Sequence, residues 1–170
     1  MESSGLPMVS AECWPYPDRP TVLFYGHVDV QPVDPVGLWV SPPFEGTVRG
    51  GKLFARGAND DKGQCMVWLG ALQALKAAHG ALPVNVKVLL ESEEEIGSPT
   101  VGPYVRAQAE RLACDAVVVC DTAMYSAESP AICTSLRGLV YTEVTVQGGR
   151  TDMHSGHYGG VAPNPLHALA

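Results

Sequence analysis

Short apolar runs alternate with helical segments through the first part of this 170-residue chain. Three of the runs have the length and the β-branched composition of buried strands: "TVLFYGHVDV" (21–30), "PVNVKVLLES" (83–92) and "CDAVVVCDT" (114–122). Helices are predicted between them, over about 63–79 and over 105–113. The order strand, helix, strand, helix, strand is typical of a layer whose strands run parallel. We therefore predict an α/β fold with a largely parallel sheet flanked by helices.

Two further elements are predicted around the long helix. "GTVRGGKLFARG" (46–57) indicates a hairpin that turns at Gly50–Gly51. The helix itself has apolar residues at spacings of three and four, and Gly80 follows as a C-terminal stop. We expect these apolar residues to form one buried stripe: Cys65, Trp68, Leu69, Leu72, Leu75 and Ala78.

The character of the sequence changes after the third strand. That strand is apolar on both faces, which is typical of the middle of a sheet flanked by helices. In a partial domain that lacks the elements covering the sheet, we expect this strand to be open at an edge. "LRGLVYTEVTVQGG" (136–149) then alternates apolar and polar residues, as in a strand with one face in water. A short helix is expected at 165–170. We predict two domains, over 1–135 and 136–170.

Composition excludes several classes of function. The chain is 46% hydrophobic and 17% charged, its net charge is −7, and it has no cluster of lysine and arginine, so a nucleic-acid partner is not expected. No apolar stretch reaches the ~20 residues that span a bilayer. We expect no signal peptide, because a basic region followed by an apolar one is absent. Five scattered cysteines without a C-x-x-C pair favour reduced thiols and a cytoplasmic location.

Side chains of the types that commonly bind metals, histidine and carboxylates, occur near the ends of the predicted strands. His27 and Asp29 lie at the end of the first strand and share one of its faces, because residues i and i+2 of a strand point the same way. Ligands of an open parallel sheet bind outside the carboxyl ends of its strands. Carboxylates occur at the corresponding ends of the other elements: Asp60 and Asp61 before the long helix, "ESEEE" (91–95) after the second strand, and Asp121 at the close of the third.

Taken singly, each of these groups has a structural explanation. A lone H-x-D can be a solvated strand end, Asp60–Asp61 a helix cap, "ESEEE" a solvated face and Asp121 a turn residue. Together they would crowd carboxylates in a cleft that holds little water, which raises their pKa values unless a cation is present. Imidazole and carboxylate ligands without cysteine suit catalytic zinc, or manganese or cobalt. We therefore interpret His27 as a metal ligand and Asp29 as the carboxylate that orients its ring.

Five motifs in this order resemble one family of enzymes: "GHVDVQP", "LFARGANDDKG", "ESEEEIGS", "VVCDT" and "TDMHSGHYGG". The chain is similar, from about residue 8 to its end, to the co-catalytic zinc hydrolases that include carnosinase, cytosolic non-specific dipeptidase, acetylornithine deacetylase and succinyl-diaminopimelate desuccinylase. The first and last motifs favour the dipeptidase branch. The resemblance implies two divalent cations, most simply zinc, and hydrolysis of a dipeptide or short peptide by a water that the two metals activate.

The resemblance also implies a role for each site residue. His27 and Asp121 would share one metal, Asp60 would bridge both across a cis peptide bond to Asp61, and Glu95 would bind the second metal. The catalytic group would comprise Asp29, which holds His27, the general base Glu94, and His154, which reaches the substrate carbonyl oxygen of a neighbouring subunit. Residues 1–135 would be part of the catalytic domain and 136–170 the beginning of a lid that makes a homodimer.

The chain departs from the family pattern at both ends. The last metal ligand of the family is a histidine far towards the C-terminus of a longer chain, and neither His157 nor His167 is assigned that or another role. The helical segment that precedes "PMVSAEC" in the family is also absent. We therefore expect an internal fragment that hydrolyses dipeptides poorly or not at all by itself. Two alternatives stay open, an N-acyl amino acid deacylase of the same family and a non-catalytic metal-binding remnant.

Overall fold

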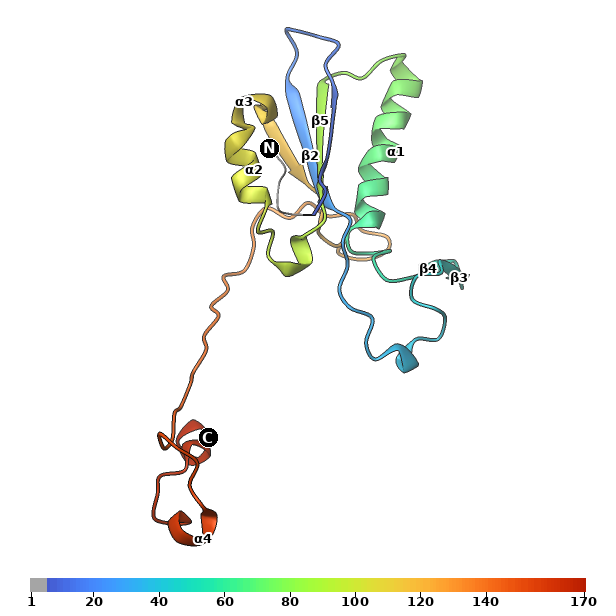
Figure 1. Ribbon diagram of the computed structural model, residues 1–170. Helices are drawn as coiled ribbons and strands as arrows, with labels where there is room; N and C mark the ends of the chain where they lie inside the picture. The colour runs from blue at the N-terminus through green and yellow to red at the C-terminus, as the bar shows by residue number, and fades with distance from the viewer. Residues whose placement is uncertain (1–5) are drawn as a thin grey trace. The chain divides into compact units, whose positions relative to one another are not determined.

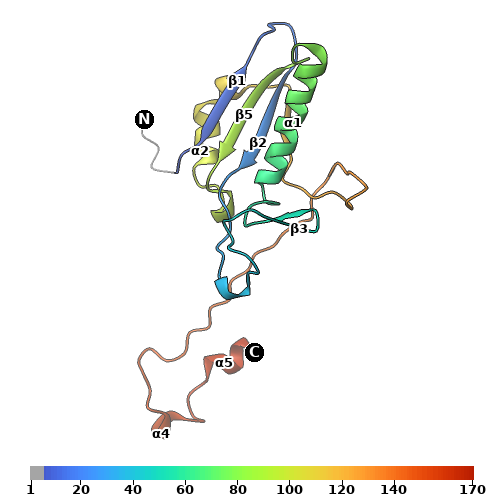
Figure 2. The same ribbon diagram turned by 90° about the vertical axis from the view of Figure 1, so that its right-hand side faces the viewer.

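The main element of the fold is a four-stranded sheet with the strand order β1-β5-β2-β6. The computed structural model describes residues 6–170. The strands β2 (Thr21–His27), β5 (Asn85–Glu91) and β6 (Ala116–Val119) are parallel, whereas β1 (Val9–Cys13) runs antiparallel to β5. Figure 2 shows β1, β5 and β2 side by side. The prediction of an α/β fold with a largely parallel sheet is confirmed.

Helices cover both faces of this sheet. In Figure 1 the helix α1 (Lys62–His79) lies on one side, and α2 (Val101–Ala107) and α3 (Ala109–Leu112) lie on the other. Phe24 of β2 stacks on Trp68 of α1 with ring centroids 5.1 Å apart. Since successive strand residues face opposite ways, Leu23 instead joins the cluster of Leu89 and Leu112 on the opposite face.

The long helix agrees with its predicted bounds, but its buried stripe is shorter than predicted. Cys65 and Trp68 are buried, whereas Leu69 and Leu75 are each more than a third exposed. The helix packs on the sheet through β2, so only its first turns are covered in the described part of the chain. Gly80 ends it in the left-handed region, at φ 76°, as the sequence predicts.

The predicted hairpin is present as β3 (Thr47–Arg49) and β4 (Lys52–Phe54). Gly50 and Gly51 both have positive φ, 54° and 75°, which suits glycine at the two central positions of a tight hairpin turn. The predicted helix at 105–113 begins earlier, as α2, and is interrupted at Gln108 before α3. The strand β1 was not predicted.

The chain divides into two compact units, residues 1–131 and 132–170. In the second unit, the strand predicted over 136–149 is wrong, because these residues form no strand and no neighbouring strand pairs with them. An alternating pattern needs such a partner to satisfy its backbone groups. The unit does contain α4 (Ser155–Tyr158) and α5 (Pro165–Leu169), where Asn164 accepts a hydrogen bond from the Leu166 N–H at 2.9 Å. The predicted domain boundary at 135 stays a prediction.

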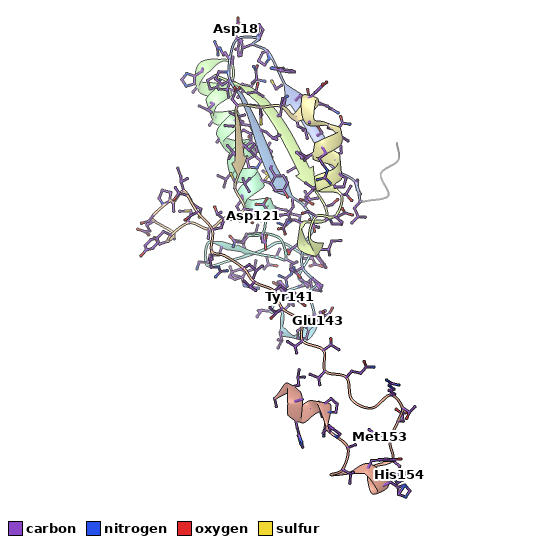
Figure 3. All side chains as sticks on the ribbon, turned by 90° about the vertical axis from the view of Figure 1, so that its left-hand side faces the viewer. Asp18, Asp121, Tyr141, Glu143, Met153 and His154 are labelled. Carbon is purple, nitrogen blue, oxygen red and sulfur yellow. The ribbon has the colours of Figure 1, made fainter. Side chains whose placement is uncertain are left out.

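The parallel strands end together at one edge of the sheet. In the register between β2 and β5, His27 lies opposite Glu91, and both are the last residues of their strands. Figure 3 shows Asp18, which precedes β2, and Asp121, which follows β6, at opposite ends of the sheet. At the outer edge, Val117 and Val119 of β6 are each more than half exposed, in agreement with the expected open edge. No helix among the described residues is long and apolar enough to cross a membrane.

Candidate metal centre

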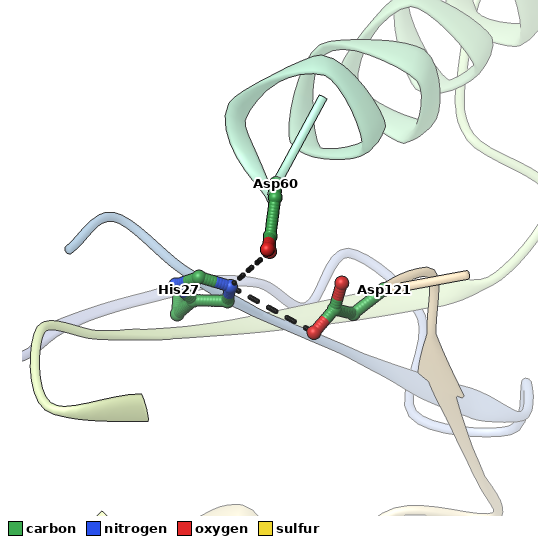
Figure 4. A group of neighbouring side chains, drawn as sticks. All are labelled: His27, Asp60 and Asp121. Carbon is green, nitrogen blue, oxygen red and sulfur yellow. Dashed lines mark hydrogen bonds and ion pairs between the residues drawn. The ribbon is translucent and has the colours of Figure 1, made fainter. Parts of the chain in front are cut away.

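Three side chains that could hold a cation meet at the carboxyl edge of the sheet. His27 ends β2, Asp60 lies just before α1, and Asp121 follows β6. One donor atom from each lies within 4.8 Å of the donor atoms of the other two (Figure 4). The topology explains this convergence, because β2 and β6 are parallel neighbours and α1 begins beside the end of β2.

The ring of His27 is completely buried and is held between carboxylates on both sides. Its Nδ1 lies 3.2 Å from Asp29 Oδ1. Its Nε2 lies 3.0 Å from Asp60 Oδ1 and 3.7 Å from Asp121 Oδ2. A neutral ring that donates its Nδ1 proton to Asp29 presents the Nε2 lone pair to the other two carboxylates. This arrangement, with one ring nitrogen held by a carboxylate and the other directed at oxygen ligands, is the one that metal-binding histidines use.

The site concentrates negative charge around a buried imidazole ring, because carboxylates of Asp29, Asp60 and Asp121 all lie close to it. Burial of the ring would lower the pKa of His27, but the hydrogen bond to Asp60 and the charges of Glu94, Asp121 and Asp29 outweigh this and raise it. Burial and then the charges of Asp61 and Asp60 raise the pKa of Asp121 above its ordinary value. A divalent cation among these groups would reverse this cost. The donor set therefore fits a metal ion.

Asp29 connects this cluster to the loop that carries the two adjacent glutamates. One of its oxygens contacts the His27 ring, and the other, Oδ2, accepts the Glu95 backbone N–H at 2.9 Å. Glu94 and Glu95 both belong to the short 3₁₀ helix η2 (Glu94–Ile96). Burial, together with the charges of Asp121, Glu95 and Asp29, raises the pKa of Glu94, which suits a group that accepts a proton near neutral pH.

Glu95 itself does not belong to the three-residue cluster. Its carboxylate oxygen Oε2 accepts a hydrogen bond from Gln31 Nε2 at 2.5 Å. Gln31 is a contact that the sequence analysis missed. The pattern "HVDVQ" could have indicated it, because polar residues at 27, 29 and 31 alternate with valines at the end of the predicted strand. The second metal site that the resemblance implies stays a prediction.

The run "ESEEE" (91–95) does not form a solvated face, the structural alternative that its charge suggested. Glu91 and Glu93 are buried, and only 1% of Glu91 is exposed. The Tyr25 hydroxyl donates to Glu91 Oε1, and Ser98 Oγ donates to the same oxygen at 2.8 Å. Ser98 has a positive φ of 52°, which is uncommon for a residue other than glycine. Buried contacts therefore fix both ends of the loop that carries Glu94 and Glu95.

Asp61 also behaves differently from a simple helix cap. It occupies the N-cap position of α1 but makes no side-chain cap hydrogen bond. Its Oδ2 instead accepts the backbone N–H of His27 at 3.1 Å. The peptide bond between Asp60 and Asp61 is cis, as the resemblance implies. The sequence analysis offered only a helix cap as a structural explanation for Asp61 and gave it no part in the site.

His154 belongs to the second unit, and a hydrogen bond within that unit indicates the tautomer of its ring. Its Nδ1 accepts the Gly156 backbone N–H at 3.0 Å, so the neutral ring carries its proton on Nε2. The ring lies beside that of His157, with centroids 5.1 Å apart. An Nε2–H group can donate a hydrogen bond to a carbonyl oxygen, which is the chemistry that the resemblance implies for this residue.

Comparison with known proteins agrees with this geometry. The profile of the peptidase family M20/M25/M40 matches residues 23–158, which include the whole three-residue cluster. This chain belongs to that family. The beta-Ala-His dipeptidase of Homo sapiens is 38% identical over 162 residues, which are 94% of this chain and 32% of that protein. A Cys-Gly metallodipeptidase of Schizosaccharomyces pombe is 38% identical over 163 residues, which are 94% of this chain and 34% of that protein.

A solved structure of the same family shares the fold. An M20 family metallo-carboxypeptidase from Sulfolobus solfataricus superimposes with a TM-score of 0.67 at 40% sequence identity, and the match covers 71% of this chain and 27% of that one. The chain thus spans about a third of the length of the curated relatives that it matches. The similarity to the M20/M25/M40 peptidases confirms the family resemblance.

Proposed function

We propose that this chain supplies the metal-binding edge of a metallopeptidase that hydrolyses the peptide bond of dipeptides or short peptides. The single observation that carries the proposal is the contact of the buried His27 ring with Asp60 and Asp121, in a chain of this peptidase family. The dipeptide class is supported by the relatives, two of which are named as dipeptidases at 38% identity. The intact cluster argues against a non-catalytic remnant.

The proposed cofactor is a pair of divalent cations, zinc in the first place and manganese or cobalt as alternatives. Bound here, the cations would polarise the scissile carbonyl and make the attacking water more acidic. His27 Nε2 and one oxygen each of Asp60 and Asp121 would hold the first cation. Asp60, whose side chain is 59% exposed, would hold the second cation together with Glu95, as the resemblance implies.

The reaction then depends on a proton acceptor close to the attacking water. We assign this role to the Glu94 carboxylate, whose raised pKa brings it closer to the pH at which it must accept and return a proton. Glu94 would take the proton from the water and transfer it to the leaving amine. Asp29 keeps the Nδ1 proton of His27 in place and accepts the backbone N–H of Glu95. It thereby connects the proposed ligand His27 to the loop that carries the proposed base Glu94.

Two further parts of the proposal rest on the resemblance. His154 would donate its Nε2 proton to the substrate carbonyl oxygen, and residues 136–170 would belong to a lid through which two subunits form a homodimer. A cytoplasmic location is also proposed, because all five cysteines are free thiols.

A hybrid enzyme tests the proposal. Residues 6–170 would replace the matching segment of the Schizosaccharomyces pombe metallodipeptidase, and the hybrid would be assayed with zinc, manganese or cobalt. We expect it to hydrolyse Ala-, Gly- and Leu-based dipeptides, and we expect Asp60→Ala in the transferred segment to abolish this activity. A folded, metal-loaded hybrid that cleaves only N-acetyl or N-succinyl amino acids would instead support the deacylase alternative. A folded, metal-loaded hybrid that cleaves neither class would contradict the proposal.

A further inference from the structure

The carboxylate of Asp61 is buried in a place that helix capping does not explain. Asp61 is 1% exposed, yet its side chain makes none of the N-terminal hydrogen bonds that an N-cap aspartate usually accepts. Its Oδ1 is buried and has no hydrogen-bond partner among the described residues. Burying a carboxylate that is only partly paired costs free energy. The buried position of this carboxylate therefore depends on the contacts of its other oxygen, Oδ2.

Asp61 Oδ2 receives two donors from different elements. The backbone N–H of His27, at the end of β2, lies 3.1 Å away, and the thiol of Cys65, one turn further along α1, lies 3.4 Å away. Burial, and then the charge of Asp61, raises the pKa of Cys65 to about 11, so the thiol keeps the proton that it donates. The two donors therefore hold Asp61 Oδ2 between β2 and α1.

The backbone of β2 comes unusually close to this carboxylate because residue 26 is glycine. A Cβ atom at Gly26 would lie 2.6 Å from Asp61 Oδ2 and 2.7 Å from Cys65 Sγ, closer than real Cβ contacts allow. The adjacent residues Asp60 and Asp61 thus contact His27 in two ways. Asp60 contacts the Nε2 atom of its ring, and Asp61 binds its backbone N–H.

We propose that Asp61 is a positioning residue for the metal site, which fixes the backbone of His27 so that Nε2 faces Asp60 and Asp121. For this role residue 61 needs a hydrogen-bond acceptor for the His27 N–H. The Cys65 thiol holds this acceptor in place, and the missing Cβ of Gly26 leaves room for it. The inference rests on the proposed metal role of His27. It concerns the geometry of the ligand and does not make Asp61 a ligand or a group that touches the substrate.

Asp115 provides a matched control at the other end of the same strand. Its Oδ2 accepts the backbone N–H of Thr21, the first residue of β2, at 2.7 Å. Asp61 and Asp115 thus bind the two ends of one strand with the same kind of hydrogen bond. Asp115→Ala should destabilise the strand without changing the metal site, whereas Asp61→Ala should change both.

The test measures Co²⁺ binding by the 170-residue chain and its variants, with the visible absorption spectrum of bound Co²⁺ as a second readout. Removal of an outer contact to a metal-binding histidine typically weakens affinity about 10–100-fold. We expect a loss of that size in Asp61→Ala and in Gly26→Ala, which leaves Asp61 chemically intact but displaces it. Asp61→Asn should stay within about threefold of the unmodified chain, because its amide oxygen accepts the same N–H. Asp115→Ala should also stay within that range.

Hydrogen exchange of single backbone amides provides an independent measurement. The amide of His27 should exchange faster in Asp61→Ala and Gly26→Ala, and that of Thr21 in Asp115→Ala. Normal Co²⁺ affinity in a folded Asp61→Ala or Gly26→Ala variant would overturn the inference. So would an Asp61→Asn variant as weak as Asp61→Ala, because charge rather than hydrogen bonding would then be required.

A last variant separates this inference from the proposed function. His27→Ala should lose Co²⁺ binding at the site. If His27→Ala binds Co²⁺ as the unmodified chain does, the metal role of His27 is wrong and the inference falls with it. If His27→Ala loses binding and Asp61→Ala does not, the inference alone is wrong.

Discussion

The Nε2 atom of His27 lies 3.0 Å from Oδ1 of Asp60, a residue 33 positions further along the chain. The first residue ends a parallel strand and the second precedes the helix that packs on that strand. The contact forms because the sheet topology brings these two ends together at one edge. It defines the centre on which the predictions below depend.

The first prediction concerns Glu94, the proposed general base. In the hybrid enzyme described above, Glu94→Gln should leave metal content nearly unchanged and should lower the turnover rate by roughly 10²–10⁴, the usual contribution of a general base. Steady-state kinetics and metal analysis of the same preparation check this. Glu110→Gln, a change of an exposed glutamate on α3, is the control and should retain full turnover. Loss of metal in Glu94→Gln would instead identify Glu94 as a ligand.

A second prediction concerns Asp29, which contacts both the His27 ring and the Glu95 backbone. Asp29→Ala should weaken zinc binding by the 170-residue chain by about 10–100-fold, because the ring loses the group that orients it. Competition with a coloured chelator measures the affinity. Asp18→Ala, at the opposite end of the sheet in Figure 3, should bind zinc normally. Equal affinities in the two variants would remove Asp29 from the metal site.

The pH dependence of metal binding gives a third prediction. A cation needs the Nε2 lone pair of His27, and protons compete for it. Because the surrounding carboxylates raise the pKa of His27, protonation should begin to oppose metal binding at a higher pH than for an ordinary histidine. The Co²⁺ affinity should therefore fall by about tenfold per pH unit below that pKa. Titrations at about pH 8 and about pH 6 check this, and an affinity that stays constant between them would exclude His27 as a ligand.

A fourth prediction concerns stability away from the site. Lys87 is 2% exposed, and its Nζ donates to the carbonyl oxygens of Arg111 at 2.6 Å and Ala113 at 2.7 Å. Lys87→Met removes the charged donor of these two hydrogen bonds and should lower the free energy of unfolding by about 1–3 kcal/mol. Urea denaturation measures it. Lys76→Met, at an exposed position of α1, should change stability by less than about 0.5 kcal/mol. Equal stabilities would show that this buried lysine contributes little.

The elements that sequence patterns predicted well are those with strong local signals. The apolar runs of β2 and β5 and the glycines of the hairpin define their structure locally. The predicted strand at 136–149 was wrong, because alternation alone does not supply a partner strand. The strand β1 was missed because Val9–Cys13 is short, lies at an edge and is only weakly apolar.

The candidate site could be predicted only in part, for a related reason. Residue type and position at the ends of predicted elements indicated a metal site with His27 as a ligand, whereas Asp60 and Asp121 followed as ligands from the family resemblance. The roles of Gln31 and Asp61 depend on hydrogen bonds to residues far away in the sequence, Glu95 and His27. Asp61 follows a residue of the site and precedes a helix, so its position alone favoured a cap. Only the structure shows that its carboxylate faces β2.

The most direct test of the central claim is a crystal structure of the chain grown with zinc, with anomalous diffraction to locate the metal. The account predicts a zinc ion bound to His27 Nε2 and to one oxygen each of Asp60 and Asp121, at about 2.0–2.2 Å. Asp121→Ala crystals should show a weaker anomalous peak at the same place. A zinc ion bound elsewhere, with the three side chains unliganded at a saturating zinc concentration, would contradict the account.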